Sequence, residues 1–232
     1  MRHPILALLV LLLPASAVQA QDGAQKLFEA MEQKLAKAKA HKIAYESDGK
    51  EGDRPHQLKG VLILATGNRF KWTFEGKDNS RAVNGVVVSD GKMQVRKTES
   101  DNKPLQWGAP HERFFEFFVG HLGRVGVHAG YEALRGDDPL NPAKLKLSGF
   151  KMAGKEKVGS REANALEYQL MLPGDDKIKA TCKLWLDVQT TLPVKRILEI
   201  NWDGKVAFRS VETYGDWELD PQLPDETFAL PK

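Results

Sequence analysis

The residues with the clearest potential for chemistry are three histidines that lie close together in the sequence, His111, His121 and His128. With Glu112 or Asp137 they could hold a metal ion, because imidazole and carboxylate groups are common metal ligands. Their spacings of ten and seven residues do not place all three on one helical turn, and the glycines between them favour a bent segment. We therefore expect surface or structural histidines and no metal site.

The sequence contains none of the strong motifs of catalysis. It has no Gly-x-Ser-x-Gly and no phosphate-binding Gly-x-x-x-x-Gly-Lys, and His111-Glu112 is followed by Phe114-Phe115 where a zinc-binding helix would need a second histidine. The segment Ser89-Asp90-Gly91-Lys92 is typical of a hairpin between two strands. Asp187 and Asp203 are expected at a strand end or turn, without an acidic partner. We expect no catalytic residues, no cofactor and no enzymatic activity.

The strongest pattern in the sequence is apolar. Phe70, Trp72 and Phe74 project to one side of a predicted strand, with polar residues between them. A predicted helix from Pro110 to Val119 has an apolar arc too wide for a single contact face. Such side chains suit the wall and the lid of a cavity for an apolar ligand, although packing in an ordinary hydrophobic core is the common alternative. The residues that we expect to line the cavity are Phe70, Trp72, Phe74, Phe114, Phe115, Phe118 and Leu122.

Two kinds of element must position these side chains. A helix is predicted over 24–40, before the first strand, and two short helices over 110–119 and 129–134 interrupt the strand pattern. The glycines from Gly120 to Gly130 could act as hinges between them. Alternating residues bounded by turn signals predict about ten strands, near 43–45, 60–65, 69–74, 81–89, 93–95, 145–152, 165–172, 178–188, 192–200 and 206–219.

The number of strands predicts the shape of the sheet. A sheet of this size cannot stay flat and must curl, so that its concave side encloses a packed core or a cavity. The fold class that we expect is α+β and mainly β. It is a single strongly curved antiparallel sheet that forms an incomplete half β-barrel, with helices covering the concave side as a lid.

The beginning of the chain has the features of a secretory signal peptide. A charged start is followed by an apolar stretch from Ile5 to Leu13 and by small residues up to Ala20. The stretch is far shorter than the ~20 residues of a membrane-spanning helix. We expect residues 1–20 to be removed before Gln21, leaving one soluble periplasmic domain over residues 21–232. A lipid-anchored lipoprotein would need a cysteine where Gln21 stands.

Composition and charge exclude some classes of partner. The formal net charge of the chain is +3, and basic and acidic residues alternate throughout, whereas nucleic-acid binders gather basic residues on one face. We expect that the protein has no nucleic acid partner and that it is a monomer. The single cysteine, Cys182, lies in an alternating strand pattern and is expected to be a small buried hydrophobe, neither a disulfide partner nor a metal ligand.

Several segments in this order resemble the periplasmic lipoprotein carrier LolA and its LolB-like superfamily. They are Asn68-Arg69-Phe70-Lys71-Trp72 leading to Val88-Ser89-Asp90-Gly91-Lys92, then Leu184-Trp185-Leu186-Asp187 with Leu192-Pro193-Val194-Lys195-Arg196, and the ending Asp225-Glu226-Thr227-Phe228-Ala229-Leu230-Pro231. The helix before the first strand and the helical interruption after the hairpin also match. The resemblance implies an incomplete β-barrel whose helices cover a cavity for acyl chains.

The resemblance has one departure. The lipoprotein carriers have an arginine shortly before the asparagine that precedes their aromatic strand, and this arginine is thought to tie the lid to the sheet. Aligning Asn68 and Trp72 places Thr66 at that position. The superfamily fold does not depend on this arginine, but handover of lipoproteins is left open.

The function expected from the residues and the resemblance is that of an exported carrier or binding protein for outer-membrane biogenesis. It would hold a lipid, or the acyl chains of a lipoprotein, in a hydrophobic cavity, and an envelope membrane protein would be its donor or acceptor. The alternative is a sensory or scaffold domain of the envelope that binds a protein or peptide with the same fold.

Overall fold

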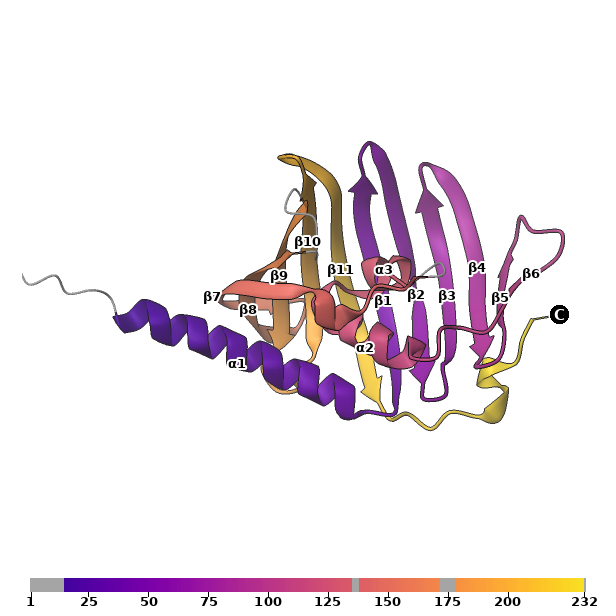
Figure 1. Ribbon diagram of the computed structural model, residues 1–232, viewed down its shortest axis with the longest axis horizontal. Helices are drawn as coiled ribbons and strands as arrows, with labels where there is room; N and C mark the ends of the chain where they lie inside the picture. Colours follow the sequence, from indigo (N-terminus) through magenta and orange to yellow (C-terminus); the bar gives the residue numbers. More distant parts are fainter. Residues whose placement is uncertain (1–14, 135–137, 172–177, 232) are drawn as a thin grey trace, which may run out of the picture.

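The computed structural model describes residues 15–134, 138–171 and 178–231. Within them, one antiparallel sheet contains eleven strands in the order β6-β5-β4-β3-β2-β1-β11-β10-β9-β8-β7. The sheet curves around one face, and three helices lie on that concave side (Figure 1). The prediction of a curved antiparallel sheet with a helical lid is confirmed.

The strands follow one another as neighbours, apart from the pairing of β1 with β11. The strands are β1 (Ala40–Glu51), β2 (Arg54–Ala65), β3 (Arg69–Asp78), β4 (Arg81–Asp90), β5 (Gln94–Thr98), β6 (Leu105–Trp107), β7 (Lys146–Val158), β8 (Arg161–Met171), β9 (Ile178–Asp187), β10 (Pro193–Trp202) and β11 (Lys205–Leu219). The helices are α1 (Ala15–Lys37), α2 (Phe114–Arg124) and α3 (Val127–Glu132), with 3-10 turns η1 (Pro142–Lys144) and η2 (Asp225–Phe228).

Turn chemistry explains where the chain reverses. Asp203 and Gly204 both have positive φ, 51° and 76°, as the two central residues of a tight hairpin require. The Asp90 carboxylate accepts hydrogen bonds from the backbone N–H groups of Lys92 and Met93, at 2.8 and 2.9 Å. Asp187 accepts equivalent bonds in the β9–β10 turn. The aspartates at these predicted turns are architectural.

Helix α1 covers the β7 side of the concave face (Figure 1). Its residues Ala24, Phe28, Met31 and Leu35 recur at helical spacing and are at most 1% exposed. The Phe28 ring meets those of Phe150 and Tyr168 at 5.2 and 4.9 Å. Burial of each large apolar side chain contributes about 1.5–3 kcal/mol. The amphipathic pattern therefore predicts the docking face, although the helix ends at Lys37, before Ala40.

The interval between Pro104 and Pro142 differs from the sequence prediction in three places. Residues 105–107 form β6, a three-residue edge strand on β5 that is too short to show alternation. Helix α2 begins at Phe114 rather than at Pro110. The side chain of Asn68, in the β2–β3 turn, fixes this start of α2. It accepts a hydrogen bond from the N–H of Phe115 at 3.1 Å and donates one to the carbonyl of Glu112 at 2.8 Å. Helix α3 spans 127–132, two residues earlier than predicted.

Most of the predicted signal peptide lies outside the described residues, so its removal before Gln21 stays a prediction. No helix in the described ranges is long and apolar enough to span a membrane. Cys182 is a free cysteine on β9, 2% exposed, and burial raises the pKa of its thiol. The expected role as a small buried hydrophobe is confirmed.

We predict that His41 on β1 makes the fold sensitive to acid. Its ring is fully buried and lies 6.0 Å from that of Phe115 on α2. Burial lowers the pKa of His41 to about 4, against the opposing attraction of Asp220. The folded protein therefore binds fewer protons than the unfolded chain, whose histidine titrates at about 6.5. The contribution to stability is full above about pH 6.5, and up to about 3 kcal/mol is lost as pH falls towards 4.

Urea unfolding at pH 7.5 and pH 4.5 measures this loss. The variant His41→Phe should lose about 2 kcal/mol less than wild type between the two pH values. His111→Phe is the control, because His111 is exposed and its replacement should leave the loss unchanged. Equal losses in wild type and His41→Phe would show that His41 is not the acid-sensitive group.

Candidate ligand cavity and its helical lid

A cavity of about 1200 Å³ lies between the concave face of the sheet and helices α2 and α3. We call these two helices the lid. The apolar residues of the cavity wall alternate along the strands, so that they share the concave face. They come from both halves of the sheet and include Leu58, Trp72, Phe74, Val83, Val87, Leu170, Ile178, Ala180, Leu198, Ile200 and Phe208. From the lid side the cavity is lined by residues including Val125, Ala129, Tyr131 and Leu140.

The ring of Phe74, one of the cavity-wall residues, lies over a glycine of the neighbouring strand. In the register of the sheet, Phe74 on β3 lies opposite Gly60 on β2 and Gly85 on β4. A Cβ atom at Gly85 would lie 2.9 Å from the end of the Phe74 ring, which is closer than van der Waals contact allows. The ring can therefore extend over its neighbouring strand only because that position has no side chain.

The edge of the cavity at the β1–β2 and β3–β4 hairpins is charged. Glu51, Arg54, Asp78 and Arg81 are exposed there and belong to the same lining. They carry two charges of each sign. The cavity thus joins an apolar interior to a polar opening, an arrangement that suits a ligand with an apolar body and a polar end.

Two of the seven predicted site residues line this cavity, Trp72 and Phe74. The rings of the two lie 5.2 Å apart, and Trp72 lies 4.6 Å from Tyr131 on α3. The Trp72 indole N–H donates to the Tyr45 hydroxyl at 2.6 Å. This bond fixes the ring at the boundary between sheet and lid.

The other five predicted residues lie where α2 packs on the sheet or at its C-terminal end. Phe70 stacks on Phe114 at 4.7 Å, and Phe114 meets Phe118 edge to face at 5.6 Å. Phe115 is half-buried, and Leu122 is buried. None of the five lines the cavity in this structure. Contact of these side chains with a ligand would require α2 to move, and it stays a prediction.

Sequence analysis missed a buried arginine, Arg196 on β10, which is 1% exposed. Its guanidinium donates to the carbonyls of Leu122 and Gly123, each at 2.8 Å. The Tyr168 hydroxyl donates to the next carbonyl, that of Arg124, at 2.7 Å. These carbonyls at the C-terminal end of α2 have no partner within the helix. The sheet therefore supplies the hydrogen bonds and the positive charge that this helix end favours.

A buried glutamate, Glu212 on β11, supplies a negative charge to the beginning of α3. Its carboxylate is 2% exposed and accepts from the backbone N–H groups of Val127 and His128, both at 2.9 Å. The Tyr214 hydroxyl also donates to it, at 2.5 Å. The beginning of α3 thus receives the negative charge that unpaired helical N–H groups favour.

Arg196 and Glu212 lie opposite each other in the β10–β11 register. Together they hold the end of α2 and the start of α3, so we call them the lid clamp. Removing one partner from such a buried pair leaves an uncompensated charge, which typically costs about 3–5 kcal/mol. Thr66, the position that the sequence analysis compared with the carriers' lid arginine, lies in the turn after β2. A charged residue on an otherwise apolar strand face was the signal in the sequence.

The candidate histidines do not come together as a metal site. His121 bonds the Leu140 carbonyl at 2.7 Å, and His111 stacks on Phe117 at 5.3 Å. His128 instead stacks on His56, a residue that the sequence analysis did not single out, at 4.8 Å. Among the described residues, which exclude Asp137, no group of three or more potential ligands could hold a metal.

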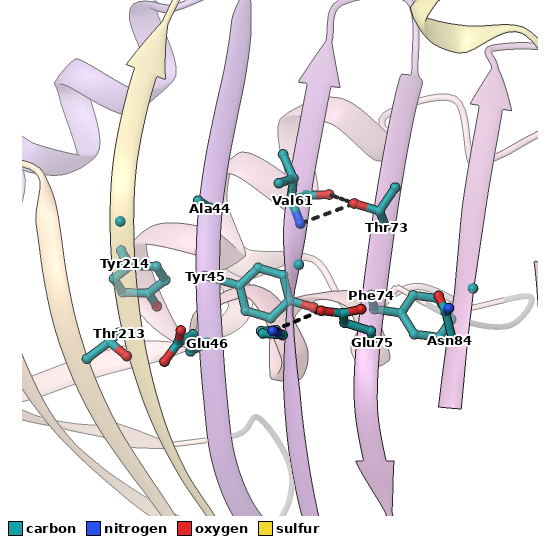
Figure 2. Close-up of a pocket in the computed structure, with 14 residues that line it drawn as sticks. Ala44, Tyr45, Glu46, Val61, Thr73, Phe74, Glu75, Asn84, Thr213 and Tyr214 are labelled. Atoms are coloured by element: carbon teal, nitrogen blue, oxygen red, sulfur yellow. Dashed lines mark hydrogen bonds and ion pairs between the residues drawn. The ribbon is translucent and has the colours of Figure 1, made fainter. Parts of the chain in front are cut away.

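A second depression, of about 640 Å³, lies on the convex face across β11, β1, β2, β3 and β4. Figure 2 shows polar side chains across it, with Thr73 bonded to the backbone of Val61. Lys59 pairs with Glu75 at 2.9 Å. The hollow shape of the depression reflects small residues such as Ala44 and Gly215. It is smaller than the concave cavity and more open to the surface, so it encloses a ligand less completely.

We predict that the clamp depends on Gly126, the residue between the two lid helices. Gly126 has φ 97°, and a Cβ atom there would collide with the Glu212 carboxylate. Gly126→Ala should therefore lower the free energy of unfolding by about 2 kcal/mol or more. Urea unfolding, with hydrogen exchange of the lid amides, measures the effect.

Gly123→Ala is the matched control. Gly123 lies within α2, and a Cβ atom there would lie 3.4 Å from the Glu32 side chain. Alanine in a helix gains up to about 1 kcal/mol over glycine, so this variant should be close to neutral or more stable. Equal losses of stability in both variants would contradict the specific role of Gly126.

No protein-family model matches the chain, and no curated protein sequence matches it. Solved structures do. LprF from Mycobacterium bovis matches with a TM-score of 0.55 at 10% identity, over 88% of this chain and 96% of LprF. Lipoprotein LppX from Mycobacterium tuberculosis has a TM-score of 0.48 at 11% identity, over 86% of this chain and 98% of its own.

A LolA superfamily protein from Nitrosomonas europaea also matches, with a TM-score of 0.38 at 11% identity, over 89% of this chain and 97% of its own. Identities this low establish likeness of fold and nothing finer. The chain has the fold of LprF over nearly the whole length of both proteins, and the incomplete antiparallel half-barrel with a helical lid that the sequence predicts is confirmed.

Proposed function

We propose that the protein is a carrier or binding protein of the cell envelope that holds a lipid, or the acyl chains of a lipoprotein, noncovalently in the concave cavity. The observation that supports this most directly is the cavity itself. About 1200 Å³ between sheet and lid is not filled by side chains of the described residues and is lined by more apolar than polar residues. A core that served stability alone would be close-packed.

The energetics favour an acyl chain as the occupant. Each methylene group exposed to water costs about 0.8 kcal/mol, so a sixteen-carbon chain in water is unfavourable by roughly 12 kcal/mol. Transfer into the apolar interior around Leu198 and Phe208 removes most of that cost. The charged residues at the hairpin edge of the cavity, Arg54 and Arg81 among them, then lie where the polar end of the ligand would meet water.

Binding without chemical conversion is the form of function that the side chains support. Ser47, which does not line the cavity, lies 3.4 Å from the cavity-wall residue His56. The Ser47 hydroxyl is also bonded to that of Ser210 at 3.0 Å and is 3% exposed, so a ligand in the cavity does not reach it. We infer that the protein is not an enzyme.

A cavity-filling substitution tests the proposal. Ala180 lines the cavity from β9, and Ala180→Phe should place a ring in the space that the acyl chain occupies. We expect its affinity for a fluorescent sixteen-carbon fatty acid, measured by titration at pH 7.5, to fall at least tenfold.

Thr181→Phe provides the matched control on the same strand. Thr181 is exposed and, as the next residue of a strand, faces the convex side, so this variant should bind like wild type. Circular dichroism verifies that both variants fold. Unchanged affinity in folded Ala180→Phe would exclude the concave cavity as the binding site.

A further inference from the structure

Two histidines on the cavity wall stack across the boundary between lid and sheet. His56 belongs to β2 and His128 to α3, and their ring centroids lie 4.8 Å apart with the planes 17° from parallel. Both rings also lie against Phe208 of β11, at 6.0 and 6.2 Å. The stack joins α3, the shorter of the two lid helices, directly to the sheet.

The surroundings suit two neutral rings better than two charged ones. His56 is 6% exposed, and its Nε2 atom lies 3.4 Å from the Ser47 hydroxyl. The Nδ1 atom of His128 is buried without a hydrogen-bond partner. Burial and the nearby His128 lower the pKa of His56 below its usual value, against the attraction of Asp78, Asp48 and Glu212.

The charged groups around the pair come from every element that packs against it. Asp48 lies on β1, Asp78 on β3 and Glu212 on β11. Arg54 lies two residues from His56 on the same face of β2, and Glu132 follows His128 by one turn of α3. The carboxylates favour a positive charge on His56. They cannot remove the repulsion between two charged rings in contact, to which Arg54 adds.

We propose that the His56–His128 stack is an acid-sensitive release for the lid. Neutral rings hold α3 against the sheet, and protonation of both rings separates α3 from β2 and opens the cavity. The release of a bound lipid by this opening rests on the proposed function, whereas the opening itself does not.

The direction of the pH dependence follows from proton binding. In the closed state the two rings are in contact and the pKa of His56 lies below its usual value of about 6.5, whereas in the open state both rings reach water. The open state therefore binds more protons. The closed state is fully favoured above about pH 6.5, and opening becomes about tenfold more favourable per pH unit for each proton taken up.

The response is expected in α3 rather than in the whole sheet. Helix α3 has six residues, and the backbone N–H of His128 is itself one of the two that the Glu212 carboxylate accepts. Displacement of His128 therefore removes a bond of the lid clamp as well as the ring stack. Short elements with few contacts open at a lower free energy than the core does.

Amide hydrogen exchange of the ligand-free mature protein at pH 7.5, 6.0 and 5.0 tests the proposal. After correction for the intrinsic rate, exchange of the α3 amides should accelerate about tenfold or more between pH 6.0 and 5.0, while the β9 amides stay protected when the comparison is made in the His41→Phe background, which lacks the buried histidine that destabilises the whole fold in acid. In His56→Gln and in His128→Gln the acceleration should disappear. The control His111→Gln, which changes an exposed histidine outside the stack, should behave like wild type.

An α3 acceleration that persists in both variants, or that appears equally in β9, overturns the proposal. Titration of the fluorescent fatty acid at the same pH values distinguishes failure of the acid-sensitive release from failure of the proposed carrier function. Binding at pH 7.5 that weakens in acid equally in wild type and variants would refute the release and leave the carrier function standing. No binding at any pH, with α3 still opening in acid, would refute the carrier function alone.

Discussion

The lid depends on two charges that the sheet buries beneath it. Arg196 bonds the last carbonyls of α2 and Glu212 bonds the first N–H groups of α3. Each helix end would otherwise leave polar groups without partners, and each charge would otherwise be buried alone. The helices and the sheet therefore stabilise each other, and Gly126 is required between them because a larger residue would displace the Glu212 carboxylate.

The cavity exists because the clamp holds the lid against the sheet only where α2 ends and α3 begins. Where α2 is drawn down onto the sheet, Phe70, Phe114 and Phe118 pack as in any core. Beyond the clamp, towards the hairpins at the top of Figure 1, the inward residues of β2, β3, β9 and β10 line open space. The same alternating pattern thus yields a packed core under α2 and an apolar cavity beside it.

The limits of sequence reasoning follow from the range of each interaction. Strand alternation and turn chemistry are local, so the curved sheet and the docking face of α1 could be predicted. The start of α2 could not, because the side chain that sets it, Asn68, lies on a distant hairpin. The pattern identified Trp72 and Phe74 as wall residues, but it could not distinguish them from Phe70, since only the position of the lid does so. His56 and the clamp carried weaker signals, as polar residues on an apolar face.

Native mass spectrometry of the protein, purified without detergent from cells that produce it, tests the binding of an acyl chain most directly. The account predicts a stoichiometric lipid or acylated peptide in the complex, or stoichiometric uptake of a sixteen-carbon fatty acid by a protein isolated empty. A folded protein that carries no lipid and takes up none would contradict it, and would favour an envelope domain that uses this fold to bind a protein or peptide.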